Sequence, residues 1–248
     1  MPRKALLIGN SYEENDWNDP LPACTRDVDA MASVLMRKCS FLKKNVEVKK
    51  NLNRTGMILA VAEFCDKLDI NDVALFYFSG HGCMQTDQFL LPCNMTSGKY
   101  EKEGCHIHEF ITNISNKCRD GMKIFIFDAC RNREASNDVS NVDPNVQRWL
   151  NESWSRHQQS DSSSRRVIMN STSDGTAANE KYDENNPRLS LYTHHLVELL
   201  DSEERDNLEI INKKLIRRLD GKRQKPVIEN RLPYPKEFFL NSSWTLEC

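Results

Sequence analysis

The chain lacks long apolar runs and lacks a strong excess of charge of either sign. No apolar stretch approaches the roughly 18 residues that predict a membrane span. The first apolar stretch, residues 5–8, is too short for the core of a secretion signal. The net charge of −2 gives no reason to expect a nucleic acid or a membrane surface as partner. These absences favour a globular chain of the cytoplasm.

Metal-binding spacing is lacking as well. The nine cysteines are irregularly spaced, and none forms with histidine the close pairs that hold zinc. His106 and His108 are too few ligands on their own. An odd number of cysteines, several of them inside expected core elements, indicates reduced thiols in an intracellular chain. We therefore expect no metal and no cofactor, and the absence of an acidic cluster gives no reason to expect calcium activation.

Short apolar runs alternate with helical patterns along the chain. Strands are expected at residues 5–8, 46–48, 73–78, 124–127 and 167–169, with a last strand from 224–228 and 238–240, and helices at 25–36, 55–68, 106–118, 190–200 and 208–219, the first capped by Thr25. Fully apolar runs predict strands that are buried on both faces, as in a parallel sheet. The alternation predicts an α/β fold with a mostly parallel sheet and helices on both faces.

Two of the expected strands lead into chemically active residues. The run 124–127 continues as Asp-Ala-Cys-Arg, and the run 73–78 continues as Ser-Gly-His-Gly. Side chains at the carboxyl ends of parallel strands reach the crevice where open α/β sheets bind ligands. His81 lies 49 residues before Cys130 (130 − 81 = 49), and one crossover brings two such ends side by side. We therefore predict a nucleophile, Cys130, and a base, His81, with the histidine on a tight exposed loop between its glycines.

These motifs resemble those of the caspase-like cysteine peptidases, which comprise caspases, metacaspases and paracaspases. The resemblance rests on residues 79–82 and 128–131, and on Ala-Leu-Leu-Ile-Gly-Asn at 5–10 and Thr-Arg-Asp-Val-Asp-Ala at 25–30. In caspases a histidine lies about 50 residues before the cysteine. The resemblance covers most of the chain. It implies one caspase-like peptidase domain over 1–248, a three-layer sandwich around a six-stranded sheet.

Within that domain the resemblance implies a large part over about 1–131, a polar linker over about 132–165 and a small part over about 166–248. The linker ends at Arg165 and Arg166, a basic pair that is a possible self-cleavage site. A tolerated surface loop is the commoner meaning of such a stretch.

The resemblance also implies the roles of the two central residues. The Cys130 thiolate attacks the peptide carbonyl, and His81 later protonates the leaving amine. The backbone N–H groups of Gly82 and Cys130 form the oxyanion hole. Taken alone, Cys130 is as well interpreted as a buried structural thiol, because free cysteine is among the most buried residues. Its pairing with His81 favours catalysis, and the other eight cysteines are interpreted as structural.

Substrate preference depends on acids near this pair. Where caspases carry an arginine for an acidic substrate residue, the chain has Ala23. Asp27 and Asp128 match acids of the first pocket of paracaspases. A third acid of animal paracaspases is replaced by alanine, with Asp174 or Glu180 as its substitute. Such carboxylates bind arginine in a bidentate manner and lysine as a point charge, which predicts cleavage after Arg or Lys. For Asp27 the alternative is an acid favoured at a helix start by the helix dipole.

Three functions stay open on this evidence. The Asp-Ala-Cys-Arg motif and the Gln-Lys-Pro at 224–226 look like the paracaspase branch, which favours a cysteine endopeptidase acting after Arg or Lys through a thioester. The alternatives are a catalytically silent scaffold that binds proteins, and an Asp-specific peptidase of the caspase type. The expected partners are protein or peptide substrates and a second copy of the chain, joined through the last strand.

Overall fold

A six-stranded sheet forms the centre of the molecule. The computed structural model describes residues 1–13, 20–84, 88–95, 99–130, 165–173, 188–222, 224–233 and 238–241. The sheet has the order β2–β1–β3–β7–β8–β9. Its strands are β1 (Arg3–Gly9), β2 (Val46–Lys50), β3 (Val73–Ser79), β7 (Met122–Asp128), β8 (Arg166–Asn170) and β9 (Val227–Arg231). All neighbours are parallel except β8 and β9, so the predicted mostly parallel sheet is confirmed.

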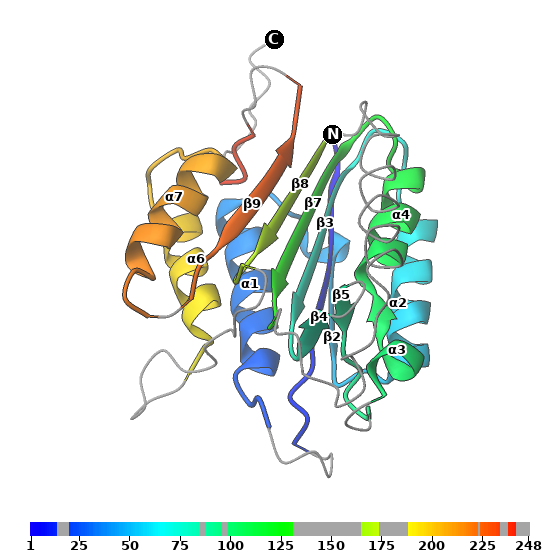
Figure 1. Cartoon of the computed structure of the whole chain (residues 1–248). Coiled ribbons are helices and arrows are strands. Elements are labelled where there is room, and N and C mark those ends of the chain that lie inside the picture. The colour runs from blue at the N-terminus through cyan, green and yellow to red at the C-terminus, as the bar shows by residue number, and fades with distance from the viewer. Residues whose placement is uncertain are drawn as a thin grey trace, which may run out of the picture.

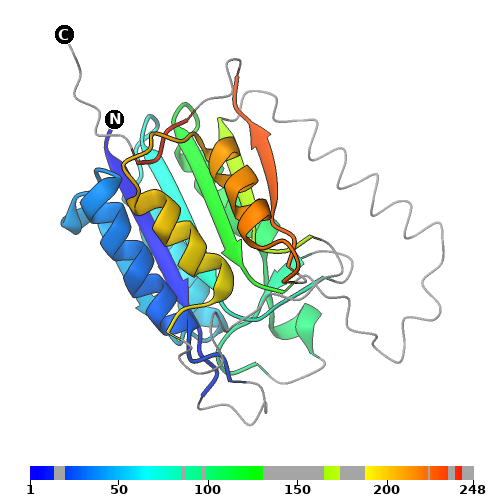
Figure 2. The same ribbon diagram turned by 90° about the vertical axis from the view of Figure 1, so that its left-hand side faces the viewer.

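Helices cover both faces of this sheet (Figure 1). One face, turned toward the viewer in Figure 2, carries α1 (Cys24–Lys38), α6 (Leu191–Asp201) and α7 (Leu208–Arg218). The other face carries α2 (Arg54–Asp66) and α4 (Ile107–Lys117), and the short elements are η1 (Lys43–Asn45) and α3 (Tyr100–Glu103). The predicted three layers are therefore confirmed. In the described part of the chain, no helix is both long and apolar enough to cross a membrane.

A second, smaller sheet follows directly after His81. It has three short antiparallel strands in the order β4–β5–β6, namely β4 (Gly82–Met84), β5 (Gln88–Leu90) and β6 (Cys105–His106). Strands of two or three residues carry no recognisable periodicity, so the sequence pattern does not predict this small sheet. This small sheet fixes the backbone that leaves the carboxyl end of β3.

Alternate residues of the central strands enter two separate cores. The side chains that pack with α1, α6 and α7 are Leu75, Tyr77, Ile124 and Ile126. Those that pack with α2 and α4 are Phe76, Phe78, Phe125 and Phe127. Since successive strand residues point to opposite faces, Ser79 and Asp128 continue the first set. The last residues of β3 and β7 therefore point toward α1 and α6.

The start of α1 differs from its sequence prediction. The helix begins at Cys24 after Ala23, and no side chain caps it, so the prediction of Thr25 as its cap is wrong. The first turn is instead held by the chain that it packs on. A Cβ at Gly9 would collide with the carbonyl oxygen of Cys24. Contact with the end of β1, rather than a local cap, thus sets where α1 starts.

The last strand is β9, which lies at an edge of the sheet. Among the described strands it pairs only with β8. Residues 238–240 do not extend it, because Phe239 forms an isolated bridge with Asn207 at the start of α7. Every residue of β9 is partly exposed. The described structure therefore leaves this edge of the sheet open.

Candidate active site

The pairing of β3 with β7 decides where His81 and Cys130 lie. Ser79 pairs with Asp128, the last position of the ladder, an offset of 49 residues (128 − 79 = 49). The same 49 residues separate His81 from Cys130. Neighbouring strands run about 4.8 Å apart. Two residues beyond the ladder, the chain thus carries the histidine and the cysteine at matching points of adjacent strand ends.

Backbone contacts hold these two strand ends together. The N–H of Gly80 donates to the carbonyl oxygen of Asp128 at 3.2 Å. A Cβ at Gly82 would lie 2.7 Å from the carbonyl oxygen of Cys130, closer than real Cβ contacts allow. Glycine is therefore required at position 82 for close approach. The residue that follows His81 lies directly against the backbone of Cys130.

The two side chains differ in exposure. His81 is buried, with 7% of its surface exposed, so the expected exposed loop is wrong. The ring of Tyr12 packs against its imidazole with 4.5 Å between centroids. Cys130 is a half-buried, reduced cysteine. By contrast, burial raises the pKa of the thiols of Cys39 and Cys105 to about 12, which suits a structural role for them.

The two acids predicted for the substrate pocket share one partner at the start of α6. The N–H of Ser190 donates to Asp27 at 2.9 Å, and its hydroxyl donates to Asp128 at 2.5 Å. Asp27 also accepts from the hydroxyl of Ser79 at 2.7 Å, and Asp128 accepts from that of Thr193 at 2.8 Å. Both acids are buried. The structure therefore joins α1, β3, β7 and α6 through one pair of carboxyl groups.

Burial changes the acidity of this pair. It raises the pKa of Asp27 to about 7, with a further contribution from the charge of Asp128. Burial also raises the pKa of Asp128, although the hydrogen bonds from Ser190 and Thr193 oppose that shift. Among the residues that the structure describes, no lysine or arginine forms an ion pair with either group. Two buried carboxyl groups without a cation resist being ionised at the same time, so the pair tends to retain a proton. A guanidinium or an ammonium group that reaches the pair can bind to it.

The remaining predicted site residues lie in or close to the segments outside the described structure. Asp174 and its alternative Glu180 lie outside the described residues, and so does the linker as far as residue 164. Arg165 is exposed, and its carbonyl already accepts a backbone N–H of β7 at 2.8 Å. Arg166 is the first residue of β8. The possible self-cleavage site therefore sits where the sheet resumes.

The sequence pattern does not predict the hydroxyl groups that surround the two acids. The hydroxyl of Tyr77 lies 2.5 Å from that of Thr193. Because Thr193 donates its single proton to Asp128, Tyr77 must donate to Thr193. A tyrosine inside the apolar run of β3 was a usable signal. The sequence gives no comparable signal for Ser190, because serine is common at a helix start.

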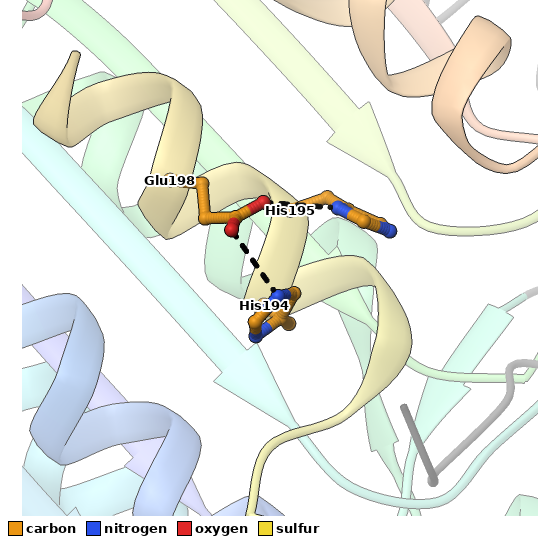
Figure 3. A group of neighbouring side chains, drawn as sticks. All are labelled: His194, His195 and Glu198. Carbon is orange, nitrogen blue, oxygen red and sulfur yellow. Dashed lines mark hydrogen bonds and ion pairs between the residues drawn. The ribbon is translucent and has the colours of Figure 1, made fainter. Parts of the chain in front are cut away.

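A group of possible metal ligands on α6 was not anticipated either. His194, His195 and Glu198 place ligand atoms within 4.8 Å of one another (Figure 3). Nε2 of His194 and Nδ1 of His195 lie 3.4 and 3.2 Å from the two carboxylate oxygens. Arg218 of α7 lies 2.8 Å from the same carboxylate. Its guanidinium already balances the charge that would attract an ion, so we interpret the group as a link between α6 and α7. The spacing of His194 and Glu198 by one helical turn is the feature of the sequence that predicts their contact.

Comparisons with known proteins agree with this architecture. The family model described as caspase domain matches residues 2–236. The chain is 32% identical over 138 residues to the mouse mucosa-associated lymphoid tissue lymphoma translocation protein 1 homolog, covering 54% of this chain and 16% of that protein. It is 27% identical over 149 residues to metacaspase-8 of Arabidopsis thaliana, covering 49% of this chain and 38% of that protein. The chain thus spans well under half of each relative.

A solved structure shows the fold independently. A protein of Geobacter sulfurreducens superposes with a TM-score of 0.64, and the match covers 92% of this chain and 93% of that one. Sequence identity is 15%, so this likeness concerns the fold alone.

Proposed function

This chain belongs to the caspase domain family, and we propose that it is a cysteine endopeptidase that cleaves after arginine and, less readily, after lysine. The family resemblance inferred from the sequence motifs is confirmed, and the relatives include a paracaspase and a metacaspase. The observation that carries the specificity is the buried pair of Asp27 and Asp128, which has no cation among the described residues.

In the proposed reaction, Cys130 is the nucleophile and His81 the base. The thiolate sulfur of Cys130 forms a bond to the substrate carbonyl carbon, and the carbonyl electrons move to oxygen. The imidazolium of His81 then gives its proton to the leaving amine as the peptide bond breaks, which leaves a thioester. Water, activated by the neutral imidazole, hydrolyses this thioester and releases the new carboxyl end. The shared offset of 49 residues between the strands and between the two side chains supports this pairing.

The oxyanion formed in both steps needs hydrogen-bond donors. We assign this role to the backbone N–H groups of Gly82 and Cys130. The close approach of Gly82 to Cys130 supports the assignment, because it keeps the two peptide units in contact. Loss of one such donor typically lowers kcat about 100- to 1,000-fold.

The acid pair accounts for the proposed preference. The guanidinium of a substrate arginine donates hydrogen bonds to both carboxylates and neutralises their charge. The ammonium group of lysine supplies the charge without the bidentate geometry. Ala23, next to α1, offers no cation for an acidic substrate residue. Asp174 completes the pocket as a third acid in this proposal.

The proposal extends to dimerisation and to self-cleavage. The open edge at β9 would pair with that of a second copy, giving a homodimer. Cleavage at Arg165 or Arg166 would separate the large part from the small part, and the matching preference for arginine supports this site.

Matched fluorogenic peptides that end in Arg, Lys or Asp test the main proposal. The wild-type protein should cleave the Arg peptide faster than the Lys peptide and leave the Asp peptide intact. Cys130→Ala should abolish cleavage, and Asp128→Asn should raise KM for Arg more than it lowers kcat. Cleavage after Asp would contradict the pocket assignment. No cleavage at any protein concentration would favour the scaffold function instead.

A further inference from the structure

Tyr12 lies next to His81 in an unusual backbone conformation. Its φ is 58°, the left-handed region that bulky residues rarely adopt. Its side chain is buried, with 2% exposed, in a small core with Cys83, Phe89 and Leu91. Non-glycine residues keep such conformations only where the surroundings fix them, and they gather at functional sites. The conformation therefore directs attention to what the side chain holds.

The hydroxyl of Tyr12 closes a ring of three hydrogen bonds. The backbone N–H of His81 donates to the phenol oxygen at 2.9 Å. The phenol donates to the carbonyl oxygen of Leu91 at 2.6 Å. The N–H of Leu91 donates in turn to the carbonyl oxygen of His81 at 3.0 Å. Both backbone groups of His81 are thus fixed by this ring.

The aromatic ring of Tyr12 holds the imidazole as well. The two rings are 4.5 Å apart between centroids and tilted by 52°. A Cβ at Gly80 would lie 2.9 Å from the phenol oxygen, so the glycine before His81 is what lets the hydroxyl reach the backbone. One side chain therefore contacts His81 through its N–H and through its ring.

From this geometry we propose that Tyr12 is a positioning residue, which holds the imidazole of His81 in the orientation that pairs with Cys130. The proposal rests on His81 acting as the base of the proposed peptidase. Tyr12 itself does not touch the reacting atoms. Its effect passes through the backbone of His81 to Gly82, which lies against Cys130.

The chemistry of the phenol suits a fixed support. Burial raises its pKa well above the ordinary value, so the hydroxyl keeps its proton at any pH at which a peptidase works. It therefore donates to Leu91 throughout, and a lone pair stays available for His81. Phenylalanine at position 12 would keep the ring and remove only the hydroxyl, leaving the buried N–H of His81 without this acceptor.

The pH dependence of Cys130 alkylation tests the proposal without a peptide substrate. Iodoacetamide modification is followed at Cys130 by peptide mass spectrometry, because only the thiolate reacts. In the wild-type protein, pairing with an imidazolium should place the apparent pKa well below about 8.5. Tyr12→Phe should move this value upward toward that of an ordinary thiol. With the Arg peptide, the same variant should lower kcat about 10- to 100-fold with little change in KM.

Tyr192→Phe is the matched control. It removes another fully buried hydroxyl, one that has no hydrogen-bond partner in the described structure, and it should leave the alkylation profile and kcat unchanged. An alkylation profile of Tyr12→Phe equal to that of the wild type would overturn the proposal, even if the variant melts at a lower temperature. An equal change in both variants would overturn it too. A wild-type Cys130 that titrates as an ordinary thiol would instead refute the dyad, and with it any role for Tyr12 in positioning.

Discussion

Replacing Asp27 by asparagine should remove part of the dependence of the unfolding free energy on pH. The folded protein buries Asp27 beside Asp128, and this raises the pKa of Asp27 from 3.8 to about 7. Between these two values the folded state binds a proton that the unfolded chain has released. Stability from this group is therefore fully present below about pH 4 and is lost as the pH rises through about 7.

The difference in pKa sets the size of the effect. At about 1.4 kcal/mol per pH unit, three units correspond to a loss on the order of 4 kcal/mol by pH 8. The hydrogen bonds from Ser79 and Ser190 to the charged form are already included in that value, because they lower the pKa that burial and the charge of Asp128 raise. Asparagine has no charge to bury, and its carbonyl oxygen can still accept from the N–H of Ser190. The variant should therefore be more stable than the wild type above pH 7 and similar to it near pH 4.

Urea unfolding of both proteins between about pH 5 and pH 8.5 measures the difference. The unfolding free energy of the wild type should fall more steeply with pH than that of Asp27→Asn. Asp29→Asn is the control, since that carboxylate is on the same helix but is exposed and paired with Lys50 at 2.7 Å. It should keep the wild-type slope. Equal slopes for wild type and Asp27→Asn would refute the reasoning about the buried pair.

Residue 82, the edge of β9 and the Arg165–Arg166 pair can each be tested. Gly82→Ala should lower kcat about 100-fold or more, because the added Cβ meets the carbonyl oxygen of Cys130, whereas Gly56→Ala in α2 should leave peptidase activity unchanged. Activity per chain should fall on dilution if the edge of β9 forms the proposed dimer; a constant value down to the lowest measurable concentration would contradict it. Incubation of the wild type should yield fragments cut after Arg165 or Arg166 that Cys130→Ala does not produce, and an intact wild-type chain would refute self-cleavage.

The strands and the mostly parallel sheet were accessible from the sequence because they depend on local patterns. The fully apolar runs of β3 and β7 predict buried parallel strands. Their ends, with His81 and Cys130, follow from the same pattern. The spacing of 49 residues between His81 and Cys130 is visible in the sequence. Only the paired strands show that it equals the offset of the β3–β7 register.

Other features could not be predicted because they depend on contacts between distant segments. Ser190, which binds both acids, lies 62 residues beyond Asp128 in the chain, and no local pattern connects them. The support of His81 by Tyr12 likewise spans 69 residues. The burial of His81 also follows from tertiary packing, since a histidine between two glycines looks locally like an exposed turn.

Covalent labelling with peptides that carry an electrophile after Arg or Asp tests the central claim most directly. The electrophile reacts only with an activated thiolate that the bound peptide reaches, so the labelled residue reports the nucleophile and the pocket together. The account predicts that the Arg peptide modifies Cys130 alone among the nine cysteines, and that His81→Ala and Asp128→Asn each slow the labelling. Equal labelling by the Asp peptide, or modification of another cysteine in place of Cys130, would contradict it.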